Sequence, residues 1–158
     1  MAVDMTDLLQ TLETEADAVA QFVDLLKLEQ VALENGDIDN LIAFAQDKTL
    51  VSDKLTALAA QRNSALAGLG LSADRAGVEA WLANRPSDIR AHSAWARIVA
   101  QASEARDLNR LNGTLIQIRM QHNAQALAAI QGASRTLHLY GPDGQTEPLL
   151  TRRINDAV

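Results

Sequence analysis

The sequence is most informative first in what it lacks: its 158 residues include no cysteine, three prolines and 3% aromatic residues. The absence of cysteine excludes a disulfide framework, a thiolate metal site and a cysteine nucleophile. A β-sandwich or barrel would need more β-branched and aromatic residues. Apolar residues still make up 47% of the chain, which is too many for a disordered protein, and Ala and Leu together supply 51 residues. The composition therefore predicts a helical protein with a core of Ala and Leu.

Charge is distributed unevenly along the chain. The net charge is −6, with 12 acidic and 3 basic residues in positions 1–60 but 8 acidic and 11 basic residues in positions 61–158. The overall negative charge disfavours nucleic-acid binding. The asymmetry fits either complementary helix faces within one fold or a basic C-terminal half that meets an acidic partner.

The start of the chain lacks the cationic residues and the apolar run of a secretory signal. No window approaches 18 consecutive apolar residues, so we expect no membrane insertion. These features predict a cytoplasmic protein.

Apolar residues recur at helical spacing through most of the chain and predict helices over about 7–34, 38–69 and 87–131, with a short connector helix over 73–83. Leu12, Val19, Leu26 and Leu33 form one heptad row. In the second helix, Lys48 and Arg62 fall on the apolar stripe, where their stems can cover apolar surface while the charges reach water. We predict an all-α fold, an elongated antiparallel three-helix coiled-coil bundle over 1–131 with an irregular C-terminal tail over 132–158.

Local signals set the expected ends of these helices. Asn35-Gly36 should stop the first helix and Asp37 should cap the second. Ser72 should cap the connector helix, and Pro86 suits the first turn of the last helix. Gly132 and the Gly-Pro-Asp-Gly turn at 141–144 should end the helical pattern. The apolar residues beyond them either pack back loosely or become ordered on a partner.

A polar cluster interrupts the last helix at Asn109, Asn112 and Gly113, and the apolar stripe runs through Asn109 and Gly113. Glycine costs about 1 kcal/mol relative to alanine inside a helix. A buried Asn can fix the register of a helix seam. The cluster therefore marks either such a register position or a point where the helix bends or receives a partner.

Motifs for catalysis are missing from the sequence. It has no phosphate-binding loop, no complete dinucleotide fingerprint and no nucleophile elbow. His92, His122 and His138 are too far apart to pair on a helix face. We expect no enzyme activity, no cofactor and no metal.

The last third of the chain contains four short motifs in a fixed order: Leu108-Asn-Arg-Leu-Asn-Gly113, Asn123-x-x-Ala-Leu127, Leu139-Tyr-Gly-Pro-Asp-Gly-Gln145 and Arg152-Arg153-Ile154. Together they resemble the FlgN family of flagellar export chaperones. The resemblance covers about 108–154 and implies an α-helical, cytoplasmic chaperone of the flagellar type III export system. Such proteins bind hook–filament junction proteins of the FlgK and FlgL type, prevent their early assembly and deliver them to the cytoplasmic domain of the export-gate protein FlhA.

By this resemblance, Tyr140 in the motif Leu139-Tyr140-Gly141 matches the tyrosine that docks on the gate. The implied cargo-binding residues are Leu127, Ile130, Leu137, Leu149, Leu150 and Ile154. The expected oligomeric state is a monomer or weak homodimer. The alternative is a structural coiled-coil adaptor that oligomerises through its seam and has no export role.

Overall fold

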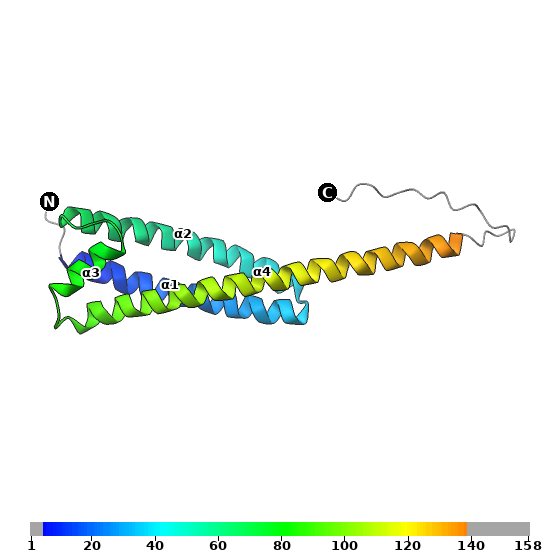
Figure 1. Ribbon diagram of the computed structural model, residues 1–158, viewed down its shortest axis with the longest axis horizontal. Helices are drawn as coiled ribbons and strands as arrows, with labels where there is room; N and C mark the ends of the chain where they lie inside the picture. The colour runs from blue at the N-terminus through cyan, green and yellow to red at the C-terminus, as the bar shows by residue number, and fades with distance from the viewer. Residues whose placement is uncertain (1–4, 139–158) are drawn as a thin grey trace. The chain divides into compact units, whose positions relative to one another are not determined.

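The computed structural model describes residues 5–138, with the side chains of residues 7–132. This part of the chain is helical and contains no strand, with α1 (Met5–Asn35), α2 (Ile38–Gly68), α3 (Arg75–Ala83) and α4 (Ile89–His138) (Figure 1). The all-α prediction is confirmed. The chain divides into two structural units, Met1–Ile116 and Gln117–Val158. None of the helices described is long and apolar enough to cross a membrane.

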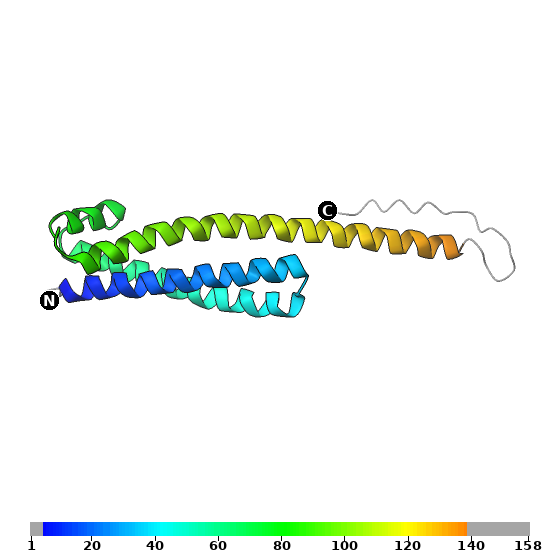
Figure 2. The ribbon, with the colours of Figure 1, turned by 90° about the horizontal axis from the view of Figure 1, so that it is seen from below.

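In the first unit, α1, α2 and the first part of α4 lie side by side (Figures 1 and 2). Ion pairs Glu15–Arg62 and Glu29–Lys48 join α1 to α2 with numbers that rise on one helix and fall on the other, so the two helices are antiparallel. Three ion pairs join α1 to α4: Glu13–Arg90, Asp17–Arg97 and Lys27–Glu104. Their residue numbers increase along both helices, so α1 and α4 run parallel. The predicted three-helix bundle is confirmed.

The predicted seams of α1 and α2 are also confirmed. Leu12, Val19, Leu26 and Leu33 are buried on α1. On α2, three of the four buried residues, Val51, Leu58 and Ala65, belong to the predicted stripe, and the fourth, Leu66, lies beside it. The heptad spacing therefore identified the inward faces of both helices.

The predicted seam of α4 is wrong by one residue. The buried residues are Ala91, Ala94, Ile98, Ala105 and Asn112, whereas Arg106 and Asn109 on the predicted stripe are exposed. Small alanines face the leucines of α1, so the largest apolar side chains of α4 do not mark its buried face. Packing volume, rather than hydrophobicity alone, sets this register.

The helix ends follow local backbone chemistry. Asp37 caps α2 as predicted, accepting a hydrogen bond from the backbone N–H of Asn40. Gly36 has a φ of 69°, which suits the glycine after α1. The cap of α3 is Asp74, which accepts from the N–H of Gly77, and not the predicted Ser72. The cap of α4 is Asp88, which accepts from the N–H of Ala91, so Pro86 precedes the helix.

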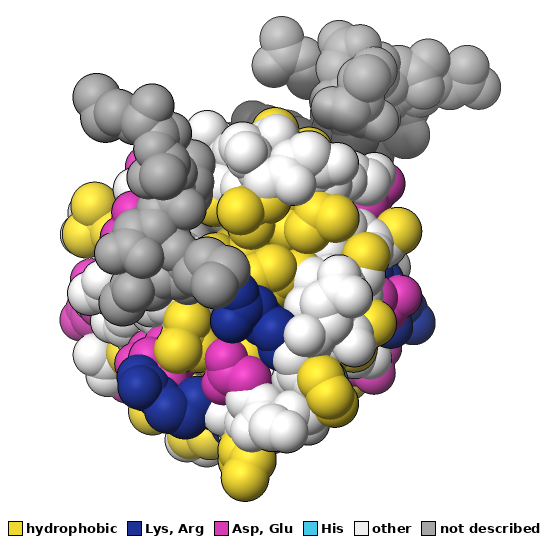
Figure 3. Space-filling model, turned by 90° about the vertical axis from the view of Figure 1, so that its left-hand side faces the viewer, with side chains coloured by type: hydrophobic (Ala, Val, Ile, Leu, Met, Phe, Trp, Pro, Cys, Tyr) yellow, Lys and Arg dark blue, Asp and Glu magenta, His cyan; other side chains and the backbone are white. Residues whose placement is uncertain are grey.

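The helix α3 lies at the end of the unit where α2 ends and α4 begins (Figures 1 and 2). We call this end the base, and the opposite end, with the turn Asn35-Gly36-Asp37, the tip. At the base, Val78, Trp81 and Leu82 of α3 join the largest buried cluster of the described residues, with partners from α1, α2 and α4. Seen end-on, hydrophobic side chains gather in the middle of the base, with charged side chains around them (Figure 3).

The last helix is longer than predicted. It continues through Gly132 to His138, so Gly132 does not end it. An isolated glycine weakens a helix by about 1 kcal/mol but does not stop it when the flanking residues favour helix. The turn at 141–144 lies outside the described residues.

Candidate functional site

From Gln117 on, α4 is exposed at every position whose side chain the structure describes. Every residue from Gln117 to Gly132 is exposed. Met120, Leu127 and Ile130 each show 56–66% of their surface to solvent. Single exposed apolar residues are ordinary, but a repeated row of them on one helix is typical of an interaction surface.

The spacing of this row shows that it lies on one face of the helix. Met120, Asn123, Leu127 and Ile130 are separated by three, four and three residues. This is the pattern of a coiled-coil seam, and the described residues include no helix that covers it. We call these four residues the α4 stripe.

The α4 stripe is not a continuation of the buried seam of the bundle. That seam passes through Ile98, Ala105 and Asn112 at intervals of seven, and its next two positions are Arg119 and Ala126. The α4 stripe falls one residue later in the heptad. The sequence of α4 therefore serves two different seams in succession.

Two of the predicted cargo-binding residues, Leu127 and Ile130, are exposed on the α4 stripe. Leu137 lies in α4, but its side chain is outside the described part. The other predicted partner-binding residues lie outside the described residues; they are Leu139, Tyr140, Gly141, Leu149, Leu150 and Ile154. The structure thus brings Leu127 and Ile130 together and leaves the remaining binding residues as predictions.

The buried seam of α4 ends at a polar layer built around Asn112, which is 1% exposed. Its Nδ2 donates hydrogen bonds to the Leu26 carbonyl oxygen and to Glu29 Oε1, both at 2.9 Å. The Nζ of Lys48 donates to both carboxylate oxygens of Glu29 at 3.0 Å. This tip layer, Glu29–Lys48–Asn112, joins α1, α2 and α4, so Asn112 occupies the kind of buried position that can fix helix register.

The other two members of the predicted polar cluster do not lie where expected. Asn109 is exposed, and nothing lies within 4 Å of the position that a Cβ on Gly113 would take. Their predicted place on the buried stripe is wrong because the whole stripe is one residue out of register. Gly113 therefore does not serve the close approach of another helix in the described structure.

A second polar layer lies nearer the base. Arg62 Nη1 donates to Glu15 Oε1, and the guanidinium lies 5.9 Å from the centre of the Trp95 ring. Burial raises the pKa of Glu15, although the charge and hydrogen bond of Arg62 act to lower it. We call this group the base layer, Glu15–Arg62–Trp95.

The side chains of Lys48 and Arg62 remain 22% and 16% exposed, and each also bonds to a glutamate whose side chain is 6–7% exposed, a pairing that was not predicted from the sequence. A sequence signal for these pairs exists. Glu15 and Glu29 are 14 residues apart, as are Lys48 and Arg62, and 14 residues are two heptads. Two acids on one seam matched by two bases on the next predict paired layers in an antiparallel hairpin.

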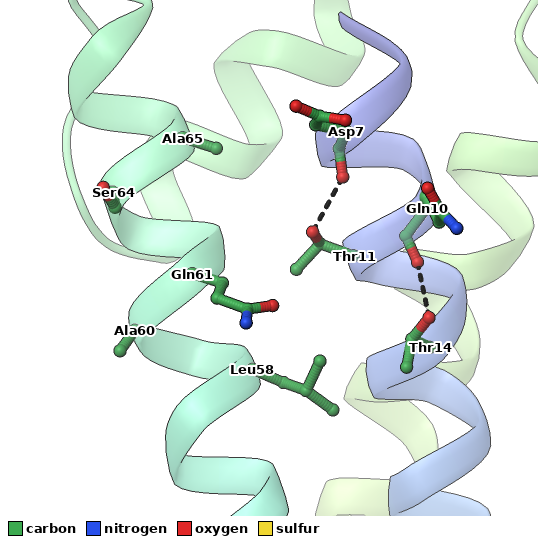
Figure 4. A pocket seen from close by; sticks show the side chains of 9 residues that line it. All are labelled: Asp7, Gln10, Thr11, Thr14, Leu58, Ala60, Gln61, Ser64 and Ala65. Carbon is green, nitrogen blue, oxygen red and sulfur yellow. Dashed lines mark hydrogen bonds between the residues drawn. The ribbon is translucent and has the colours of Figure 1, made fainter. Parts of the chain in front are cut away.

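The α1–α2 face carries an open groove, shown in Figure 4 with its nine lining residues. The hydroxyls of Thr11 and Thr14 donate back to the carbonyl oxygens of Asp7 and Gln10, at 2.7 Å and 2.9 Å. Asp7 is the one ionisable residue among those that line it. No group of three or more His, Asp or Glu within the described part could hold a metal ion. The groove supplies no arrangement of acid, base and nucleophile.

Comparison with known proteins identifies relatives along nearly the whole chain. A family model described as "FlgN protein" matches residues 1–148. "Flagella synthesis protein FlgN" of Yersinia enterocolitica serotype O:8 / biotype 1B (strain NCTC 13174 / 8081) is 31% identical over 156 residues, covering 92% of this chain and 97% of that protein. A second Yersinia enterocolitica protein of the same name is 43% identical over 65 residues, covering 38% of this chain and 42% of that protein. No solved structure matches. The chain therefore belongs to the FlgN family.

Proposed function

We propose that this protein is a cytoplasmic export chaperone that binds hook–filament junction proteins, prevents their premature assembly and delivers them to the flagellar type III export gate. The observation that carries the proposal is the α4 stripe, an uncovered coiled-coil seam in a chain of the FlgN family. The relatives named for flagella synthesis support the pathway. Masking requires binding alone, so the proposed role involves no catalysis.

The stripe has the chemistry needed to receive an amphipathic helix. Helix-in-groove recognition uses anchors at positions i, i+3, i+4 and i+7, and Met120, Leu127 and Ile130 supply such a row. Met is flexible and adapts to partners of different shape. A junction-protein helix seated here would have its own apolar face covered, which is the masking that a chaperone must provide.

The proposed docking of the gate rests on the family motif rather than on geometry. Tyr140, with Leu139 and Gly141, matches the motif that docks on FlhA in the family. A tyrosine suits this role because its ring buries a large area while its hydroxyl keeps a hydrogen bond. The proposed delivery step thus uses Tyr140, which is not part of the α4 stripe.

Calorimetry with purified junction proteins tests the cargo site. In the double variant Leu127→Asp/Ile130→Asp, we expect affinity to fall about 30-fold or more, because losing one interface hot spot costs about 2 kcal/mol. Ile89→Asp is the matched control, since Ile89 is 81% exposed and lies at the base. Its affinity should stay within about twofold of the wild type. Equal affinity in all three proteins would refute the proposed cargo site.

The gate site has its own test. Tyr140→Ala should abolish binding to the cytoplasmic domain of FlhA while cargo affinity stays unchanged, and Tyr140→Phe should retain part of the binding through its ring. If Tyr140→Ala weakened both interactions equally, the residue would have a folding role and the proposed docking would be wrong.

A further inference from the structure

The flank of the bundle between α1 and α4 carries a ladder of ion pairs. Its rungs are Glu13–Arg90 at 2.7 Å, Asp17–Arg97 at 3.2 Å and Lys27–Glu104 at 2.9 Å. On α4, these rungs are spaced at intervals of seven residues. On α1 the paired residues are four and ten residues apart, so the ion pairs follow one heptad row on α4 and a broader face on α1.

Beyond the last ion pair, each helix has an exposed apolar residue. Seven residues after Glu104 comes Leu111, and one helical turn after Lys27 comes Val31. The exposed fraction is 43% for Leu111 and 53% for Val31. Toward the tip, exposed hydrophobic residues therefore follow the ion pairs on both helices.

Neighbouring apolar residues on α1 and α4 extend Val31 and Leu111 into a larger surface. Leu28 precedes Val31 by three residues and is half-exposed, while Leu108 and Leu115 lie three residues before and four residues after Leu111 and are partly buried. Side chains three or four apart share a helix face. We call these five residues, Leu28, Val31, Leu108, Leu111 and Leu115, the tip flank.

The exposed apolar side chains of the first unit are concentrated near the tip. In the described residues of that unit, the large hydrophobic side chains with substantial exposure are Leu28, Val31, Ile38, Ile42, Leu50, Ile89, Leu111 and Ile116. Only Ile89 belongs to the base. A patch confined to one end of a bundle is typical of an interaction site.

The charge around the tip favours one class of partner. Residues 104–116 of α4 contain two carboxylates and two arginines, with no net charge, whereas residues 24–48 contain six carboxylates and two lysines, for a net charge of −4. Each of these lysines is already paired with a glutamate, Lys27 with Glu104 and Lys48 with Glu29. A second copy of this chain would bring two acidic tips together, and like charges at an interface cost several kcal/mol.

We propose that the tip flank is a second docking surface, which receives a cationic amphipathic helix from another protein. Leucine-type anchors of that helix would pack on Leu28, Val31 and Leu111, and its basic residues would face the acidic tip. This surface is distinct in sequence from the α4 stripe. It would let the protein hold a second partner without releasing its cargo.

Fluorescence anisotropy with a labelled Leu/Lys amphipathic peptide as the probe tests the proposal on the full chain. A Leu/Glu peptide with the same Leu spacing is the control probe. We expect the Leu/Lys peptide to bind and the Leu/Glu peptide not to bind, with the affinity falling as salt is added. Equal binding of both peptides would overturn the proposal.

Variants locate the binding. In Val31→Asp/Leu111→Asp, the affinity for the Leu/Lys peptide should fall by about tenfold or more, equivalent to about 1.4 kcal/mol. In Ile89→Asp, this affinity should change less than about twofold. If the double variant does not fold, Asp39→Lys/Asp47→Lys reverses charge at two exposed positions of the tip and should also weaken binding.

Two results would refute the tip flank as the docking surface for this peptide. One is that Leu127→Asp/Ile130→Asp removes the binding while Val31→Asp/Leu111→Asp does not, which would assign the peptide to the α4 stripe. The other is sedimentation showing a homodimer that Val31→Asp/Leu111→Asp dissociates, which would make a second copy the occupant. Neither result bears on the cargo site, whose own test uses junction proteins.

Discussion

The base and the tip of the bundle are built from the same three long helices, yet they are held together differently. At the base, α3 contributes Val78, Trp81 and Leu82, three of the eleven buried residues of the largest cluster described. Toward the tip, the separate cluster described comprises Val23, Leu26 and Ala105. A nine-residue helix therefore changes one end of the bundle into a closed core, while the other end keeps apolar side chains available for partners.

The two polar layers repeat this contrast. In the base layer, Glu15 accepts a hydrogen bond from Arg62. In the tip layer, Glu29 accepts hydrogen bonds from both Lys48 and Asn112. Each layer leaves one buried oxygen without a hydrogen-bond partner among the described residues, Glu15 Oε2 in the base and Asn112 Oδ1 in the tip. The tip layer therefore has more hydrogen bonds but is not fully satisfied, and buried polar groups of this kind favour a unique register over maximum stability.

The largest effect should follow from opening the base. Trp81→Ala removes the largest side chain that α3 inserts into the core, and such a change in a core costs about 3–5 kcal/mol. Urea unfolding followed by circular dichroism measures it. Leu50→Ala, at an exposed position of the tip half, should stay within about 0.5 kcal/mol of the wild type. Similar losses in the two variants would show that the base is no more closely packed than the tip.

A smaller effect should separate the two polar layers. Arg62→Met leaves the buried Glu15 without its cation and should cost about 3 kcal/mol. Lys48→Met leaves Glu29 with the amide of Asn112, so its cost should be only about 1–2 kcal/mol. Urea unfolding measures the free energy of unfolding of both variants, and Lys54→Met, at an exposed position, is the control. A larger loss for Lys48→Met would reverse the assigned order of the layers.

Replacing Gly113 on α4 by alanine should change the stability still less, and should raise it. Nothing surrounds Gly113, so Gly113→Ala should stabilise the protein by about 1 kcal/mol through helix propensity alone. The same change at Gly77, in the base, should destabilise it, because the new Cβ would collide with the Ser72 carbonyl oxygen. Thermal unfolding of both variants measures the difference. A loss of stability in Gly113→Ala would indicate a close approach of another chain or helix.

The sequence predicted the fold where side-chain size and hydrophobicity agreed. On α1 and α2, large aliphatic residues occupy the buried heptad positions, so Leu12, Leu26 and Leu58 identified the seams. On α4, the buried positions hold Ala91, Ala94 and Ala105. Alanine is common on any helix face, so hydrophobicity pointed to the wrong row.

Two residues of the candidate site were suggested by the sequence. The family resemblance implied Leu127 and Ile130 as binding residues, and the structure shows both exposed on α4. The buried glutamates were missed because a single acid on a helix predicts a solvated face. Only the matched spacing of Glu15 with Glu29, and of their cations on α2, distinguishes them.

The smallest effect we expect is a pH dependence that comes from the base layer. Burial raises the pKa of Glu15, and Arg62 offsets part of this effect. A carboxyl with a higher pKa in the folded than in the unfolded chain stabilises the fold when protonated. That stabilisation is complete below the ordinary Glu value of about 4.3 and is lost as pH rises through the folded pKa.

Glu15→Gln removes this titration, so its free energy of unfolding, relative to the wild type, should rise between about pH 4 and pH 7. Asp74→Asn is the matched opposite. The backbone N–H of Gly77 lowers the pKa of Asp74, so the stability that its carboxylate provides is present above the ordinary Asp value and is lost as pH falls. Relative to the wild type, Asp74→Asn should therefore lose stability as pH rises through the ordinary Asp value of about 3.9, which is below the pH range of the Glu15 effect. Urea titrations at a series of pH values measure both slopes, and slopes of the same sign would contradict the desolvation of Glu15 by the closed packing of the base.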